Sequence, residues 1–133
     1  IFGGPGETPG TVEEGLANLD RLDRCVVLAS SGLSVYPGTG LHRVALREGT
    51  VKPDEDFRQP VFYFSPGVDP EWLAGRLTTA FRRRRDRIYP ASSADEKAAV
   101  LRRMGYRGLL WDTLIRWDSP EPVAAPARAG GGR

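Results

Sequence analysis

The sequence has little cysteine, little excess charge and no long hydrophobic run, and each shortage narrows the roles open to it. Its 133 residues contain one cysteine, Cys25, so no internal disulfide can form and a reducing cytoplasm is the expected compartment. The N-terminus lacks the basic start and apolar core of a secretory signal. The longest uncharged stretch, residues 25–41, is interrupted by Ser, Gly, Pro and Thr, so no transmembrane segment is expected.

The charge balance gives little support to a nucleic-acid partner, and none is expected. The formal net charge is +2, and the pI near 9.0 reflects a few surplus arginines. The densest basic stretch is RRRRDR, from Arg82 to Arg87, but consecutive arginines on a helix point in different directions. We interpret this run as a solvated helix end, where cations lie near the negative C-terminus.

Apolar spacing predicts alternating strands and helices in the first part of the chain. Residues 1–2 are typical of the end of a buried strand. Thr11 and Glu14 match a capping box, and apolar residues at helical spacing predict a helix over about residues 12–23. The run CVVLASSGLSVY, residues 25–36, predicts a second strand that is buried at its start. Strand, helix and strand form the repeating unit of a parallel sheet or barrel.

A short helix and a short strand are expected in the middle of the chain. The helix covers about residues 41–48 and ends at Gly49, which suits the left-handed position after a helix. The strand is VFYFSPG, residues 61–67, which is stopped by Pro66. The polar segment KPDEDFRQP between them predicts an exposed loop.

Two more helices are expected after this strand. Asp69 followed by Pro70 is typical of a helix start. The buried face of this helix is expected to contain Trp72, Leu73, Leu77 and Phe81. Ser93 and Glu96 match a second capping box, and Gly105 is a suitable stop for the last helix.

The opening FGGPGET is the first candidate site, because glycines at Gly3, Gly4 and Gly6 precede a helix start. Such a loop lets backbone N–H groups approach a ligand, and a helix N-terminus favours an anionic or oxygen-rich group. The nucleotide fingerprints do not fit, since no Gly-Lys-Ser/Thr follows and Pro9 stands where GxGxxG requires glycine. The loop is therefore either a ligand-binding turn or a tight connection from strand to helix.

Three segments in order resemble the C-terminal part of a radical S-adenosylmethionine (SAM) barrel, in the branch that carries a cobalamin-binding domain. The segments are GGPGETPGTVEEGL, SSGLSVYPGTGLHRVALREG and PVFYFSP. Within that branch, FGGPGET and FYFSP are most similar to bacterial enzymes associated with lipid biosynthesis. The resemblance covers residues 1–66 well and the remainder only generally.

The resemblance implies an α/β fold in which residues 1–50 are the last β/α units of a partial (β/α) barrel. Residues 51–118 would be a mainly helical C-terminal extension with a short strand and two helices. Residues 119–133 are expected to be a disordered tail, because they have few apolar anchors. The chain would be the C-terminal part of a larger enzyme, beginning within a strand. Its partners would be the rest of that protein and a small-molecule or lipid-precursor substrate.

The resemblance also implies a cofactor site. In the family, the turn corresponding to Gly3–Thr8 lies at the C-terminal mouth of the barrel, close to SAM. The candidate cofactor-binding residues are therefore Gly3, Gly4, Gly6, Glu7 and Thr8. For Glu7 and Thr8 an alternative stays open, in which both hydrogen-bond loop amides and only fix the turn.

The chain lacks the residues that hold the family's metal centres. The family uses three cysteines in CxxxCxxC to bind a [4Fe-4S] cluster, whereas Cys25 stands alone in an apolar pattern typical of a buried, inert thiol. The Asp-x-His-x-x-Gly signature of cobalamin domains that bind through histidine is missing, and His42 is interpreted as a surface side chain.

SAM, the cluster and, as an open alternative, cobalamin are therefore expected in the parent enzyme and not in the isolated chain. The parent would cleave SAM and use the resulting radical on an unactivated carbon. No catalytic or metal-binding residue is expected among these residues, and the chain alone is expected to be inactive. The competing interpretation is a non-catalytic α/β interaction or structural module derived from the same fold.

Overall fold

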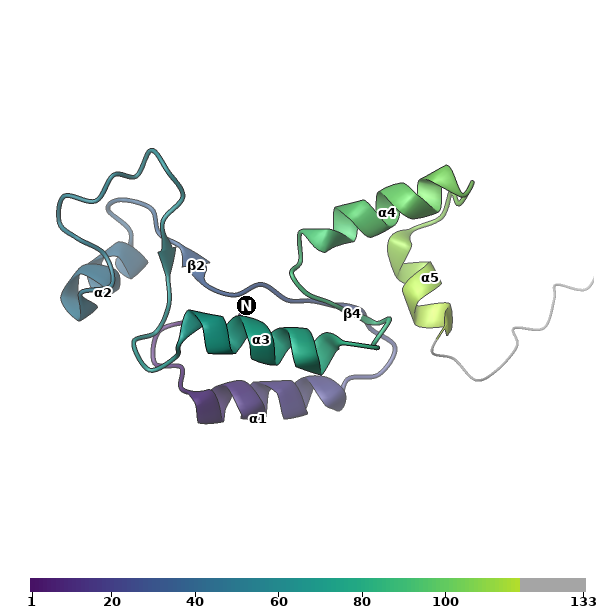
Figure 1. Cartoon of the computed structure of the whole chain (residues 1–133), viewed down its shortest axis with the longest axis horizontal. Helices are drawn as coiled ribbons and strands as arrows, with labels where there is room; N and C mark the ends of the chain where they lie inside the picture. Colours follow the sequence, from purple (N-terminus) through teal and green to yellow (C-terminus); the bar gives the residue numbers. More distant parts are fainter. Residues whose placement is uncertain (118–133) are drawn as a thin grey trace, which may run out of the picture.

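The structure, a computed structural model, describes residues 1–117 and has a mixed α/β architecture. Its elements in chain order are α1 (Pro9–Asp20), β1 (Val27–Leu28), β2 (Leu33–Ser34), α2 (Gly40–Glu48), β3 (Phe62–Tyr63), α3 (Pro70–Phe81), β4 (Arg87–Ile88), α4 (Ser93–Arg103) and α5 (Leu110–Trp117). Helices α1 and α3 lie side by side along the central strands, while α2 and the α4–α5 hairpin lie at opposite ends of the molecule (Figure 1). No helix within residues 1–117 has the length and apolar character required to cross a membrane.

Short parallel segments form the centre of the fold. Phe2 and Ser31 form a parallel bridge, in which the N–H of Phe2 donates to Ser30 at 2.9 Å and the N–H of Gly32 donates to Phe2 at 2.8 Å. Strands β1 and β4 are also parallel, with Val27 opposite Arg87. Parallel segments require long crossover connections. Helix α1 lies in the connection between Phe2 and its partner Ser31. Within residues 1–117 these pairings form no closed barrel.

Apolar side chains between the helices and the parallel segments form the larger core. Val12 and Leu16 of α1 and Leu73 and Leu77 of α3 are buried there against Phe2. Full burial of one such side chain contributes about 1.5–3 kcal/mol relative to leaving it exposed. The core thus holds the strand ends, and the loops that follow them, in a defined place.

A second, smaller core lies under α2. Strands β2 and β3 are antiparallel, with Leu33 opposite Tyr63. Buried side chains of this core are Val35, Ala45, Val51 and Tyr63. The left-handed Gly49, with φ of 72°, ends α2 as predicted.

The prediction of one strand over residues 25–36 is wrong, because this stretch divides into β1 and β2 in different sheets. Gly32 lies between them with φ of +76°, a conformation that interrupts an extended strand. The ring of Phe64 packs against Gly32, so close that an added Cβ would lie 2.7 Å from the ring atom Cζ. The chain therefore turns where a glycine admits an aromatic ring.

The predicted start and end of the first helix are also wrong. Its N-cap is Thr8, whose hydroxyl accepts from the N–H of Thr11 at 3.3 Å, while the Thr11 hydroxyl accepts from the N–H of Thr8 at 2.9 Å. Pro9 occupies the first turn, where its missing N–H has no cost. The box is therefore Thr8–Thr11 and not Thr11–Glu14, and α1 ends at Asp20 rather than near residue 23.

The later helices agree with the sequence in part. Asp69 caps α3 as predicted, and its carboxylate accepts from the N–H of Trp72 at 2.8 Å. Leu73, Leu77 and Phe81 are buried, but Trp72 is exposed. Helix α4 follows Ser92 without a side-chain cap bond, so the second capping box is wrong.

The extension holds more elements than predicted. Within residues 51–117 the structure has two strands, β3 and β4, and three helices, α3, α4 and α5. Strand β4 and helix α5 were not expected. The predicted disordered tail, residues 119–133, lies outside the described residues.

Candidate functional site

The loop Gly3–Thr8 lies at the carboxyl end of a parallel segment. The loop follows Phe2, which pairs with Ser31, and Tyr89 follows β4, which pairs with β1. Because parallel segments share their direction, the loop, Ser31 and Tyr89 lie toward the same edge. Ligands in parallel α/β folds bind outside this edge.

Gly3 has a conformation and a packing environment that suit glycine. Its φ is +92°, and an added Cβ would lie 3.1 Å from Cδ1 of Phe64 and 3.2 Å from the backbone nitrogen of Gly32. Gly6 also has a positive φ, of +80°, but faces open space. Gly4 is different, since a Cβ there would make only an ordinary contact with Leu33 at 3.7 Å. Close packing therefore restricts Gly3, turn geometry restricts Gly6, and neither restricts Gly4.

The carboxylate of Glu7 turns back onto the start of the loop. Its oxygen Oε2 accepts hydrogen bonds from the backbone N–H of Gly3 and from that of Gly4, the latter at 3.1 Å. Consecutive amides of this kind form an anion-binding concavity, which here holds a carboxylate of the protein itself. Both donors use Oε2, so Oε1 is not engaged by them. Glu7 thus makes the contact that fixes the turn and presents a second carboxylate oxygen.

The loop is anchored to the turn between β3 and α3. The N–H of Ser65 donates to the carbonyl of Gly3 at 3.0 Å, and the Ser65 hydroxyl donates to the carbonyl of Glu7 at 2.8 Å. An added Cβ at Gly67 would lie 3.1 Å from the same Glu7 carbonyl. Thr8 is exposed and serves as the cap of α1. The backbone of FGGPGET and that of FYFSP are therefore in direct contact, although they lie far apart in the sequence.

A hydroxyl pair that sequence reasoning missed joins two of the strand ends. The side-chain oxygens of Ser31 and Tyr89 lie 2.9 Å apart and are partly buried. The ring of Tyr89 meets that of Phe81 edge to face, with centroids 6.4 Å apart. No local sequence signal connects Ser31 with Tyr89, because only the pairing of β1 with β4 brings them together.

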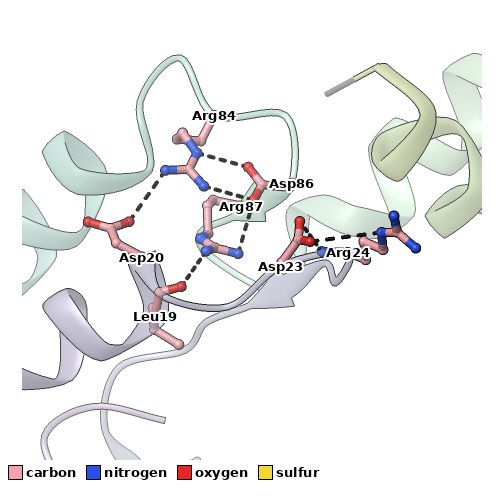
Figure 2. A network of polar contacts seen from close by, with 7 residues as sticks. All are labelled: Leu19, Asp20, Asp23, Arg24, Arg84, Asp86 and Arg87. Carbon is pink, nitrogen blue, oxygen red and sulfur yellow. Dashed lines mark hydrogen bonds and ion pairs between the residues drawn. The ribbon is translucent and has the colours of Figure 1, made fainter. Parts of the chain in front are cut away.

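The arginine run is not the solvated helix end that its composition predicts. Helix α3 ends at Phe81, and Arg87 lies buried in β4 (Figure 2). Arg84 donates to both carboxylate oxygens of Asp86, at 3.0 and 2.9 Å, and also to Asp20 at 3.3 Å. Arg87 donates to the carbonyl of Leu19 at 2.6 Å.

The cluster of Asp20, Arg84, Asp86 and Arg87 has a structural role. It connects the end of α1 to the start of β4, at the edge opposite the glycine loop. The hydrogen bond from Arg84 holds the pKa of Asp86 below its usual range, against the opposing effect of burial and with a further contribution from the charge of Arg87. A cavity of about 350 Å³ lies beside the cluster and is lined in part by Cys25 and Asp23.

Cys25 and His42 lie outside the glycine loop and depart from their predicted environments. Cys25 is only partly buried, contrary to the fully buried thiol expected from its apolar neighbours. His42 is also partly buried and not a simple surface side chain: its Nδ1 accepts from the N–H of Gly38 at 3.2 Å, and its ring meets Phe57 edge to face.

The described residues do not fit an iron–sulfur cluster. No group of three or more His, Cys, Asp or Glu side chains within residues 1–117 is placed to hold a metal ion, and the sequence offers a single thiol. The loop offers a different group, namely the carboxylate oxygen Oε1 of Glu7, which the amides of Gly3 and Gly4 do not engage. A carboxylate oxygen is suited to an organic ligand that carries hydrogen-bond donors.

Fold and site together define a mixed α/β protein with a glycine loop at the carboxyl edge of short parallel strands. No protein-family model matches the chain, and no significant match is found among curated proteins or solved structures.

Proposed function

We propose that this chain is the C-terminal part of a radical SAM enzyme, in which the loop Gly3–Thr8 lies beside SAM. One observation carries the proposal: the three segments of the resemblance meet at one point. The ring of Phe64 packs against Gly3 and Gly32, each of which comes from a different segment. A set of motifs linked by function is expected to converge in this way, whereas unrelated likenesses along the chain are not.

The architecture supports the same proposal. Phe2, β1 and β4 are parallel, and α1 and α3 pack on them from one side. A partial (β/α) barrel is built from such units, with ligands at the carboxyl edge. The preceding barrel strands would come from the rest of the parent protein.

In the proposed site, Glu7 has two tasks. Its Oε2 accepts from the amides of Gly3 and Gly4, while Oε1, which these amides do not engage, would accept from the ammonium group or a ribose hydroxyl of SAM. SAM would supply the carbon radical once it is reductively cleaved. The cluster that cleaves it would be held by cysteines outside this chain, and cobalamin remains an open alternative for the parent. The substrate class we propose is a small molecule or lipid precursor with an unactivated carbon.

The first experiment is to examine the coding sequence upstream of Ile1 for CxxxCxxC. If the motif is present, the protein that carries it is purified anaerobically, reconstituted with iron and sulfide, and assayed for 5′-deoxyadenosine. Reductive formation of 5′-deoxyadenosine is the expected result. An upstream sequence without the motif, or a reconstituted protein that forms no 5′-deoxyadenosine, would reject the proposal.

A second experiment tests the loop in that protein through Glu7→Gln, with the exposed Glu14→Gln of α1 as matched control. Loss of a charge-assisted hydrogen bond to SAM is expected to weaken binding by about 1–3 kcal/mol, which is roughly 5- to 150-fold in Kd. Unchanged affinity in folded Glu7→Gln protein would restrict Glu7 to fixing the turn.

A non-catalytic interaction or structural module is the second candidate, and one observation favours it. Glu7 and Thr8 already hydrogen-bond groups of the loop and the first turn of α1, so the loop is stable without a ligand. Under this alternative the upstream sequence lacks CxxxCxxC, and the loop glycines affect stability alone.

A further inference from the structure

An open hollow adjoins the turn that anchors the glycine loop. Its volume is about 530 Å³, and ligand pockets in proteins typically measure about 300–1,000 Å³. Phe62, Thr50 and the segment 64–70 line it. Within that segment, Ser65 donates to the carbonyl of Glu7 at 2.8 Å, and Gly67 approaches the same carbonyl closely. The hollow and the candidate loop are therefore neighbours.

Two phenylalanines form an apolar wall of this hollow. Tyr63, which stands between them, is fully buried in the core under α2. Successive side chains of a strand point to opposite faces, so Phe62 points away from that core, and it is 51% exposed. The ring of Phe64 packs against Gly3 and Gly32 and also lines the hollow. The wall therefore contacts the glycine loop and presents an exposed aromatic ring to a ligand.

The polar side chains of the lining are already engaged within the fold. The hydroxyls of Thr50 and Ser65 donate to backbone carbonyls at 3.2 and 2.8 Å, and the carboxylate of Asp69 accepts from a backbone N–H at 2.8 Å. Apolar surface is therefore the main feature that these side chains leave to a ligand.

The charges of the lining disfavour an anionic ligand. Among the described residues that line the hollow, Asp69 is the only charged one. Residues 59–75 contain no Lys or Arg, and the cation nearest along the chain to a lining residue is Lys52, two positions after Thr50. Strong hydrogen bonds to phosphate or carboxylate groups come from charged donors. The lining provides no such donor.

We propose that the hollow binds an uncharged, apolar organic molecule, and that this molecule is the body of the substrate on which the radical acts. The assignment as substrate rests on the proposed function, whereas binding to the hollow does not. Contact with Phe62 and Phe64 removes apolar surface of the ligand and of the protein from water. Nucleic acid is a poor occupant, because its phosphates require cations.

The test is titration of the isotope-labelled 133-residue chain with octan-1-ol, octanoate and octylammonium, followed through the amide NMR shifts. The three probes share one hydrocarbon chain and differ in charge. Octan-1-ol should shift the amide signals of residues 62–69. It should bind at least about fivefold more tightly than octanoate, because the anion would lose water beside Asp69 without gaining a cation.

This titration contains neither SAM nor an iron–sulfur cluster, so its result is separate from that of the 5′-deoxyadenosine assay. Failure of octan-1-ol to bind would overturn the hollow as a binding site and leave the radical SAM proposal standing. A reconstituted parent protein that forms no 5′-deoxyadenosine would reject the assignment as substrate, even if octan-1-ol binds.

Phe62→Ser tests the aromatic wall and should weaken octan-1-ol binding about tenfold. The side chain is half exposed, so the variant should keep the circular dichroism of the parent chain. Phe62→Leu keeps an apolar side chain there and should retain most of the binding. Met104→Ser removes a side chain that is 78% exposed at the end of α4, and it should leave binding unchanged.

Four outcomes would overturn the proposal. They are equal affinity for octan-1-ol and octanoate, unchanged affinity in folded Phe62→Ser, amide shifts centred on the α4–α5 hairpin, and octylammonium binding more than about tenfold tighter than octan-1-ol, which would assign the hollow to a cationic ligand.

Discussion

The guanidinium of Arg87 donates a hydrogen bond to the backbone carbonyl of Leu19 at 2.6 Å and so connects β4 to the end of α1. The side chain of Arg87 is 2% exposed and lies 3.1 Å from the carboxylate of Asp86. The last carbonyls of a helix lack partners within the helix, and a cation near them is also favoured by the helix dipole. This relationship explains why a fully charged side chain is buried in a strand.

Arg87→Met is expected to lower the free energy of unfolding by about 3 kcal/mol. The variant fills similar space, but it removes one donor from the Leu19 carbonyl, which keeps the N–H of Leu22 at 3.1 Å, and it removes one of the cations beside buried Asp86. Equilibrium urea unfolding measures the change. Arg82→Met, exposed just after α3, is the matched control and should cost about 0.5 kcal/mol or less. Equal losses in both variants would contradict a special role for Arg87.

The stability of the fold should depend on Asp86 in acid. Its pKa is lowered in the folded state, chiefly by the hydrogen bond from Arg84, so the unfolded chain takes up this proton more readily. The contribution is complete above the unfolded pKa near 3.8 and is lost as the pH falls through the lower, folded pKa.

Urea unfolding between about pH 6 and pH 2 should therefore show a steeper loss of stability for the parent chain than for Asp86→Asn. Exposed Asp54→Asn provides the control and should follow the parent curve. If stability falls with pH equally steeply in Asp86→Asn and in the parent chain, Asp86 has the same pKa in the folded and the unfolded state.

Two glycines with nearly the same backbone angle separate the effect of packing from that of conformation. Gly32 has φ of +76° and Gly38 has φ of +78°, but an added Cβ would meet the ring of Phe64 at 2.7 Å in the first case and open space in the second. Gly38→Ala should cost about 1 kcal/mol from backbone strain. Gly32→Ala should cost at least about 2 kcal/mol more, because the ring must move. Thermal unfolding of both variants checks the difference, and equal Tm values would place the ring away from Gly32.

Tyr63 should titrate later than ordinary tyrosines. Burial raises the pKa of its hydroxyl to about 12, and the hydrogen bond to the carboxylate of Glu48 adds to the rise. The protonated form is favoured in the fold, so the associated stability is present below pH 10 and is lost between about pH 10 and pH 12.

Absorbance at alkaline pH follows the four tyrosines of the chain. Tyr63→Phe should remove the part of the absorbance change that occurs at the highest pH, whereas exposed Tyr36→Phe should leave it in place. If this part of the titration curve persists in Tyr63→Phe, the assignment to Tyr63 is wrong.

Local signals in the sequence determined the helices that have clear ends. Gly49 ends α2 and Asp69 starts α3 as predicted, because each acts on backbone groups within one turn. The candidate loop was found in the same way, from glycines before a helix. The exact cap of α1 was missed because Thr8 and Thr11 both suit a cap, and Pro9 decides between them.

Only the tertiary structure decided what required a distant partner. The strand expected over residues 25–36 divides because Phe64, which directly follows β3, packs against Gly32. The arginine run ends in a buried strand because β1 and Leu19 receive Arg87, and no short-range pattern reports on either. A helix cap depends on neighbours along the chain and can be recognised from a few residues of sequence. A two-residue strand has too little periodicity to be recognised in this way, and it exists only through its pairing with another strand.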